Sequence, residues 1–358
     1  MILKNRMKAV VWKGTGCIGV EERPVPELQK DTDAIIRVTL TTICSSDIHI
    51  KHGAVPRAVP GVILGHEFVG VVEAVGASVR KVKPGDRVAV NVETFCGECF
   101  FCRRGYVNNC QSPEGGWALG CRIDGGQAEY VRIPFADNGL NRIPEGVSDE
   151  QALFTGDLMS TGYWAASIGE IRQGDTVAVI GAGPAGLCTM MAARLYGPEH
   201  IAAIDISQER LELAKSLGLA DVAVNPERES AEALLKALTE GRGADTVFEV
   251  AGGKDTFSLA WRLARPNGVV GLIAMYEEDQ RLPLPEMYGK NLIFKTGGVD
   301  AGHCDEILKL TAEGRIHPES LITHRTDFSD IMEAYEVFEA KKDGIVKWAI
   351  SFGSKYTE

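Results

Sequence analysis

Four cysteines lie close together in the chain with the spacing of metal ligands. The segment from Cys96 to Cys110 has the pattern C-x2-C-x2-C-x7-C, with Cys99 and Cys102 between its ends. Four thiolates complete the tetrahedral shell of a structural Zn²⁺ ion and leave no position for water. An iron–sulfur cluster usually uses other spacings, and two disulfides do not suit a reducing compartment. We therefore predict a structural zinc site, with these two arrangements as the alternatives.

A second set of metal-binding side chains is spread along the chain. Cys44 follows a strand-like run, His66 and Glu67 precede another, and Asp157 lies near the start of the second half. A cysteine, a histidine and one carboxylate leave the fourth zinc position for water or substrate, as a catalytic zinc requires. Taken alone, however, Cys44 also fits a small buried residue and His66 a hydrogen-bonded histidine. Spacing by itself does not bring these residues together.

A glycine-rich turn predicts a dinucleotide site. The strand-like run Thr176–Ile180 leads into Gly181, Gly183 and Gly186 with the spacing G-x-G-x-x-G, and a helical pattern begins at Pro184. These glycines allow a tight turn, close approach to a pyrophosphate and packing of helix on strand. The next strand ends at Asp205, which suits a ribose 2′-hydroxyl and repels a 2′-phosphate, so we expect NAD(H). Arg210 lies nearby and could weaken that preference.

The elements around these residues divide the chain into two kinds of structure. The first part has short strands separated by Gly, Pro and charged turns, which indicates a β-rich barrel or sandwich. From Glu150 a helical run to Ile168 leads into six short strands alternating with helices, which favours a doubly wound parallel sheet. Helical runs at Cys304–Thr311 and Ser329–Ala340 and a last strand, Ile345–Ser351, form a tail too short for a separate domain. We expect this tail to pack onto the first part.

Composition excludes several classes of protein. With 45% hydrophobic and 24% charged residues, the chain of 358 residues can form a sizeable core. Its net charge of −11 argues against binding to nucleic acid or an anionic membrane surface. No apolar run is long enough for a transmembrane helix, and the start lacks a signal-peptide core. We therefore expect a cytoplasmic protein.

Together these motifs, in this order, resemble the zinc-dependent medium-chain dehydrogenase/reductase family, which includes the zinc alcohol dehydrogenases. The resemblance spans Met7 to Phe352 and includes Gly65-His66-Glu67, the four-cysteine lobe and the glycine turn. It implies an α/β protein with a GroES-like β-rich catalytic domain, residues 1–156 and 298–358, and an inserted Rossmann domain, residues 157–297. Relatives pair through an edge strand, so a homodimer or homotetramer is expected.

The resemblance also implies roles for individual residues. Cys44, His66 and Asp157 would ligate a catalytic zinc, with Glu67 as an alternative ligand. Ser46 and His49 match the positions of a proton relay, and Asp47 would orient His66. Lys347 matches a basic residue that contacts the cofactor pyrophosphate; an exposed lysine without a role is the alternative. The cofactors would be two zinc ions per chain and NAD(H).

The implied activity is reversible hydride transfer between NAD and an alcohol. Aspartate at the third ligand position resembles bacterial secondary-alcohol dehydrogenases and the formaldehyde dehydrogenase branch, so a secondary alcohol is the expected substrate. The chain lacks the long insertion of the formaldehyde branch, and it has a four-cysteine lobe that the secondary-alcohol enzymes lack. Trp117, Leu158 and Tyr276 are candidates for the substrate pocket wall. A polyol dehydrogenase is the main alternative; a non-catalytic zinc- and NAD-binding relative and a zinc-free quinone reductase are the others.

Overall fold

The chain forms two compact units, the second inserted into the first. The computed structural model describes residues 5–353, so the ends of the expected first domain, residues 1–4 and 354–358, lie outside it. The first unit extends to Ser160 and resumes at Asp300, and the second is Thr161–Val299. The predicted boundaries lie slightly earlier, so Asp157 belongs to the first unit. No described helix is both long and apolar enough to cross a membrane.

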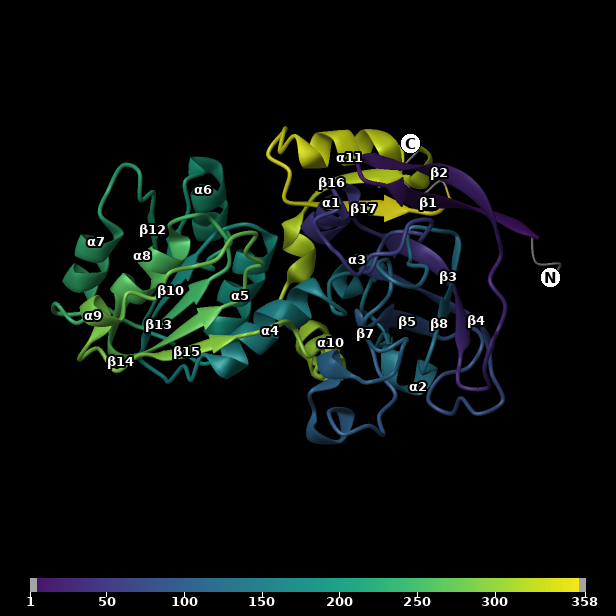
Figure 1. The fold of residues 1–358 in the computed structure, drawn as a ribbon, viewed down its shortest axis with the longest axis horizontal. Helices are drawn as coiled ribbons and strands as arrows, with labels where there is room; N and C mark the ends of the chain where they lie inside the picture. Colours follow the sequence, from purple (N-terminus) through teal and green to yellow (C-terminus); the bar gives the residue numbers. More distant parts are fainter. Residues whose placement is uncertain (1–4, 354–358) are drawn as a thin grey trace. The chain divides into compact units, whose positions relative to one another are not determined.

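The first unit is built around a seven-stranded sheet that uses both ends of the chain (Figure 1). Its path is β16-β17-β3-β4-β5-β9, with β8 paired to β3. The strands are β3 (Ala34–Thr41), β4 (Phe68–Val75), β5 (Arg87–Val90), β8 (Tyr130–Ile133), β9 (Leu140–Arg142), β16 (Ile322–Asp327) and β17 (Lys347–Ser351). Because β17 pairs antiparallel with β3, the tail of the chain completes the sheet that the beginning starts. This is the GroES-like domain that the sequence predicts.

Smaller elements complete the first unit. Alternating side chains of β3, β4 and β5 enclose an apolar core that includes Ile36, Phe68 and Val88. The remaining strands are β1 (Arg6–Gly14) and β2 (Cys17–Pro24), which form a hairpin, and the short pair β6 (Glu93–Thr94) and β7 (Gly116–Trp117). The helices are α1 (Ser45–Lys51), α2 (Ala136–Gly139), α3 (Asp149–Ala152), α10 (Cys304–Ala312) and α11 (Ile331–Glu339).

The second unit is a six-stranded parallel sheet with the order β12-β11-β10-β13-β14-β15. Its strands are β10 (Thr176–Ile180), β11 (His200–Ile204), β12 (Val222–Val224), β13 (Ala244–Glu249), β14 (Ala264–Leu272) and β15 (Ile293–Thr296). This is the strand order of the Rossmann fold. All five residues of β10 are buried, as expected for a central strand covered by helices on both faces.

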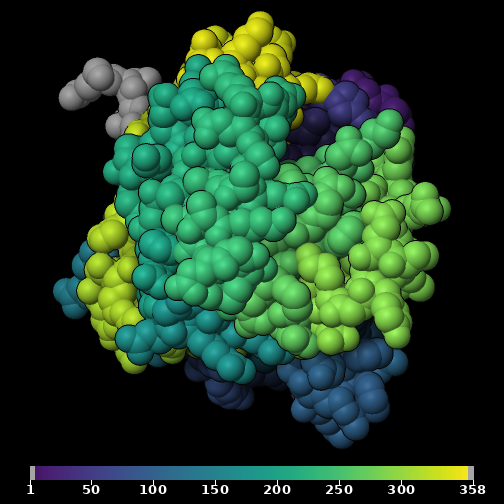
Figure 2. Space-filling model, turned by 90° about the vertical axis from the view of Figure 1, so that its left-hand side faces the viewer, coloured from purple at the N-terminus to yellow at the C-terminus, as the bar shows by residue number. Residues whose placement is uncertain are grey.

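Helices connect these strands and cover the sheet (Figure 1). They are α5 (Pro184–Arg194), α6 (Gln208–Ser216), α7 (Ala231–Leu238), α8 (Thr256–Leu263) and α9 (Leu284–Met287). The surface facing the viewer in Figure 2 belongs mainly to this unit, drawn in teal to light green. The Rossmann domain predicted from the glycine turn is therefore present.

The prediction of one continuous helix from Glu150 to Ile168 was wrong. The structure has α3 and then α4 (Leu158–Ile168), separated by residues 153–157. Gly156 explains the break, because a Cβ atom there would lie 1.8 Å from the carbonyl oxygen of Val90. The backbone passes so close to β5 at this point that only glycine fits. The break places Asp157 directly before α4.

Candidate functional site

The four side chains of the second metal set converge in the first unit. Ligand atoms of Cys44, His66, Glu67 and Asp157 all lie within 4.8 Å of one another. Cys44 precedes α1, His66 and Glu67 precede β4, and Asp157 precedes α4. The N-terminal ends of one strand and two helices therefore supply the cluster. The spacing of the residues along the chain could not show this convergence.

Packing around glycine brings the histidine to this cluster. Gly65 has φ +95°, and a Cβ atom there would lie 2.6 Å from the backbone nitrogen of Gln127. Gly65 thus permits both a left-handed turn and a close contact that another residue would prevent. The turn directs His66 and Glu67 into the interior, where each side chain is 1% exposed.

The donor set fits a divalent cation. Both ring nitrogens of His66 and the Glu67 Oε2 atom are buried and form no hydrogen bond to a described residue. Asp47 Oδ1 and Asp157 Oδ2 approach the two His66 nitrogens, each at 3.4 Å. Burial alone lowers the pKa of His66, but Asp47, Asp157 and Cys44 outweigh it and raise that pKa well above its ordinary value. The cluster thus combines sulfur, imidazole and carboxylate groups, which are the ligands that zinc prefers.

A buried network behind His66 holds the histidine in place. Asp47 Oδ2 accepts a hydrogen bond from the Cys44 backbone N–H at 2.9 Å and from Gln127 Nε2 at 3.2 Å. The Tyr335 hydroxyl donates to Gln127 Oε1 at 2.7 Å. Sequence analysis anticipated the position of Asp47 beside His66, but it missed Gln127 and Tyr335. No local sequence signal marks these two residues, because each is far along the chain from Asp47 and Tyr335 reaches the network from α11.

Lys347 lies next to the cluster rather than at the surface. Its Nζ donates to Glu67 Oε1 at 2.6 Å and to the Ile43 carbonyl oxygen at 3.3 Å, and its side chain is 1% exposed. Burial lowers the pKa of Lys347, but the charge of Glu67 outweighs this effect and raises it. The lysine is thus a counter-ion for Glu67, which excludes the exposed alternative. The expected contact with the cofactor pyrophosphate stays a prediction.

Ser46 and His49 occupy one face of α1. They are three residues apart and half-buried, whereas Asp47 and Ile50 point into the interior. Ser46 Oγ lies 3.8 Å from Cys44 Sγ, so the hydroxyl is next to the cluster. This arrangement suits a side chain that exchanges a proton with a group bound there.

The four cysteines of the first set also come together. Their sulfur atoms lie within 4.8 Å of one another, with Cys99 to Cys102 at 3.4 Å and Cys96 to Cys110 at 3.6 Å. A disulfide needs about 2.05 Å, and no cysteine among the described residues forms one. The edge of a tetrahedral zinc–thiolate site is about 3.8 Å, from Zn–S bonds of about 2.3 Å. The spacing therefore fits one zinc ion and does not support the disulfide alternative.

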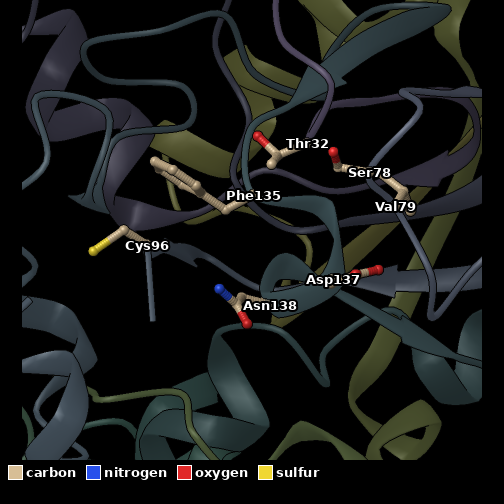
Figure 3. Close-up of a pocket in the computed structure, with 7 residues that line it drawn as sticks. All are labelled: Thr32, Ser78, Val79, Cys96, Phe135, Asp137 and Asn138. Carbon is tan, nitrogen blue, oxygen red and sulfur yellow. The ribbon is translucent and has the colours of Figure 1, made fainter. Parts of the chain in front are cut away.

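A small pocket adjoins this lobe, and no side chain of the second metal set lines it. Thr32, Ser78, Val79, Phe135, Asp137 and Asn138 line it with Cys96. In Figure 3 the Cys96 sulfur points away from the other lining side chains. Cys96 therefore contributes its sulfur to the four-cysteine set rather than to the pocket.

The second unit presents the expected glycine turn at the carboxyl end of its central strand. Gly181 has φ +100°, and a Cβ atom on Gly186 would lie 1.8 Å from the Gly181 carbonyl oxygen. Gly183 is the residue before α5, whose N-terminus offers free N–H groups to a phosphate. Asp205 Oδ2 accepts a hydrogen bond from the Ala182 N–H at 2.7 Å, which ties the second strand to the turn.

Other residues near this turn complete the site. The Arg210 guanidinium lies 3.5 Å from the position of a Cβ atom on Gly183, so its charge is beside the turn. Glu249 is fully buried at the end of β13 and accepts hydrogen bonds from the N–H groups of Ala251 and Gly252, both at 2.9 Å. Tyr276, a candidate for the pocket wall, donates its hydroxyl to Glu249 at 2.5 Å. Sequence analysis did not identify Glu249.

Comparison with known proteins agrees with this geometry. Residues 30–145 match the model of the alcohol dehydrogenase GroES-like domain, and residues 184–301 match that of the zinc-binding dehydrogenases. Zinc-type alcohol dehydrogenase B of Aspergillus flavus is 36% identical over 96% of this chain and 81% of its own length. The chain belongs to the zinc-dependent medium-chain dehydrogenase/reductase family. It is therefore an oxidoreductase of the zinc-type alcohol dehydrogenase group.

Two further family members resemble the chain over nearly its whole length. The solved structure of alcohol dehydrogenase TADH from Thermus sp. ATN1 has a TM-score of 0.89 and 37% identity, covering 97% of this chain and all of that one. The NADP-dependent isopropanol dehydrogenase of Thermoanaerobacter brockii is 32% identical over 95% of this chain and 98% of its own length. Family membership thus implies zinc and a nicotinamide cofactor, and at least one relative uses NADP.

Proposed function

We propose that this chain is an NAD(H)-dependent zinc alcohol dehydrogenase that interconverts a secondary alcohol and its ketone. The cluster of Cys44, His66, Glu67 and Asp157, with Ser46 beside it on α1, is the observation that carries the proposal. Because Glu67 is paired with Lys347, three ligands remain and a fourth zinc position is open to substrate, whereas a purely structural site would be closed and would have no need of an adjacent proton-transfer group.

Each side chain of the cluster has a distinct part in this proposal. Cys44, His66 and Asp157 would hold a zinc ion, and Glu67, already paired with Lys347, would be an alternative ligand. When bound, zinc would act as a Lewis acid that makes an alcohol more acidic, and the nicotinamide would accept the hydride. Asp47 accepts from the Cys44 N–H and lies against His66, so it would fix the orientation of both ligands.

The proton would leave through α1. Ser46 Oγ would accept the proton of the substrate hydroxyl, and His49, on the same face of the helix, would pass it to solvent. The four-cysteine lobe would hold a second zinc ion without contact with substrate. The chain would therefore carry two zinc ions.

Asp205 supports NAD(H) as the cofactor. Its carboxylate caps the glycine turn through Ala182 and accepts from the Ser207 N–H at 2.8 Å, so it is held at the end of β11. A fixed negative charge there would accept hydrogen bonds from ribose hydroxyls and would repel a 2′-phosphate. We further infer that the chain acts as a homodimer or homotetramer.

Reduction of NAD and of NADP by a panel of alcohols tests the proposal. The panel contains primary alcohols, secondary alcohols, diols and polyols, each tested with the zinc-loaded protein. We expect the highest kcat/KM with NAD and a substrate that carries a secondary hydroxyl group, and little activity with primary alcohols. A protein that contains two zinc ions and binds NAD but reduces it with none of these alcohols would be the non-catalytic relative.

A further inference from the structure

A buried glutamate stands beside the catalytic cluster without an assigned role. Glu93 on β6 is directly opposite Trp117 on β7 in an antiparallel pair. Directly opposite residues of such a pair project from the same face, with Cβ atoms about 5 Å apart. Trp117 meets the His66 ring edge to face, with centroids 5.5 Å apart. Glu93 therefore lies on the face of β6 and β7 that adjoins the zinc ligand.

The Glu93 carboxyl has unused hydrogen-bonding capacity. The residue is 5% exposed, and its Oε2 atom is buried and bonds to no other part of the chain that the structure describes. A buried carboxyl oxygen without a partner is destabilising, so such atoms normally bind a ligand or an ordered water. The residue's own N–H group does not satisfy this oxygen, because the Glu93 N–H donates to Asn91 Oδ1 at 2.9 Å.

The charges around Glu93 indicate the kind of group it would bind. Burial, followed by the negative charge of Asp157, raises the pKa of Glu93 to about 8 despite the opposing charges of Arg57 and Arg122. The two arginines would repel an ammonium group, whereas a neutral hydroxyl can form a hydrogen bond with the carboxyl group in either protonation state.

The neighbouring aromatic ring suits the carbon chain of the same ligand. Trp117 contacts the His66 ring and is the cross-strand neighbour of Glu93, and the exposed Arg57 guanidinium covers its ring at 4.9 Å from the centroid. An indole beside a polar group is a common combination where a protein binds a hydroxylated carbon skeleton. Trp117 was expected in the pocket wall, and Glu93 adds a polar group to the same side.

We propose that Glu93 binds a second hydroxyl of the substrate, so that the preferred substrates are secondary alcohols with a neighbouring hydroxyl, namely vicinal diols and longer polyols. This inference rests on the proposed function, and it makes Glu93 a specificity-determining residue. A buried water held by Glu93 is the competing explanation. It predicts a structural role that does not distinguish between substrates.

Two alcohols that differ by one hydroxyl separate these explanations. We would measure kcat/KM for 2,3-butanediol and 2-butanol with the zinc-loaded wild type, Glu93→Leu, Glu93→Gln and, as a matched control at an exposed loop position, Glu145→Leu. Glu93→Leu should lower the ratio of kcat/KM for the diol to that for 2-butanol about tenfold. Glu93→Gln, whose amide also donates and accepts, should keep the ratio within about threefold, and Glu145→Leu should leave it unchanged.

The proposal is wrong if Glu93→Leu lowers kcat/KM for both alcohols equally or changes neither, because a water-binding or purely structural glutamate would not distinguish the two alcohols. Saturation-transfer NMR on the same proteins gives a second measurement that needs no turnover. In the wild type, saturation transfer to the diol should exceed saturation transfer to 2-butanol. This comparison can be made even if Glu93→Leu fails to fold. If the wild type oxidises neither alcohol but binds the diol through Glu93, the proposed function fails and the inference stands.

Discussion

The Tyr335 hydroxyl should control both the stability of the first unit and the zinc affinity of the cluster. Tyr335 is 1% exposed, and burial together with the nearby charge of Asp47 raises its pKa well above the ordinary value. The hydroxyl therefore stays protonated and donates to Gln127 Oε1. The same amide donates to Asp47 and to the Thr42 carbonyl oxygen. Tyr335→Phe removes the hydroxyl that donates to Gln127 Oε1 and leaves the hydrogen bonds of Gln127 Nε2 in place.

The expected size of the effect follows from the buried acceptor. Phenylalanine fills almost the same volume, so no cavity forms, but Gln127 Oε1 loses its donor in the interior. An unsatisfied buried acceptor costs about 1–3 kcal/mol. Residues that orient a ligating histidine change metal affinity about 10–100-fold when removed. Because Tyr335 acts on His66 through Gln127 and Asp47, we expect the lower end, about tenfold.

Two assays on one set of proteins measure these effects. Urea unfolding of metal-free protein, followed by tryptophan fluorescence, gives the free energy of unfolding, and competition with a chromogenic chelator gives the zinc affinity. Tyr288→Phe is the matched control, because Tyr288 is 94% exposed. The reasoning is refuted if Tyr335→Phe unfolds and binds zinc like the wild type, or if Tyr288→Phe shows losses of the same size.

Three other substitutions test separate parts of the account. Ser46→Ala should lower kcat about 100-fold with zinc content unchanged, as expected for a lost proton-transfer group; full activity would remove Ser46 from the relay. Asp205→Ala should shift the ratio of kcat/KM for NAD to that for NADP at least about tenfold toward NADP, and an unchanged ratio would show that Asp205 does not select the cofactor. Cys102→Ser should lower the zinc content by one ion per chain and reduce thermal stability. Retention of both ions would contradict a zinc site in the four-cysteine lobe.

Elements with strong local patterns were predicted closely from the sequence. The range Thr176–Ile180 matches β10, and the helical run Cys304–Thr311 matches α10 to within one residue. The strand is a largely apolar run that ends at a glycine turn. The break between α3 and α4 could not be predicted, because Gly156 is required by contact with β5 rather than by its neighbours in sequence.

Short elements depended on tertiary contacts. The pair β6 and β7 has two residues in each strand, which is too few for a pattern of alternating side chains. Helix α1 follows Cys44 and has only seven residues, so the segment suggested ligands and relay residues but no helix. These elements carry Glu93, Trp117, Ser46 and His49, and their placement had to come from the structure.

The candidate site likewise has a part that the sequence predicted and a part that only the structure shows. The four-cysteine lobe was predicted because its ligands are local, whereas the second set depended on a family resemblance to connect residues up to Asp157. Gln127 and Tyr335 were missed because their roles exist only where the segment before β8, α1 and α11 brings them together with Asp47. The sequence did not predict that Lys347 pairs with Glu67, and its expected contact with the cofactor stays a prediction.

The rate of NADH formation from a secondary alcohol, compared between the wild type and Cys44→Ser, tests the central claim most directly. Both proteins are loaded with zinc and shown to bind NAD equally, so that a loss of rate reports on the cluster and not on the Rossmann domain. The account predicts steady turnover by the wild type and a rate at least about 100-fold lower for Cys44→Ser. Equal rates, or no turnover by a wild type that holds both zinc ions and NAD, would contradict it.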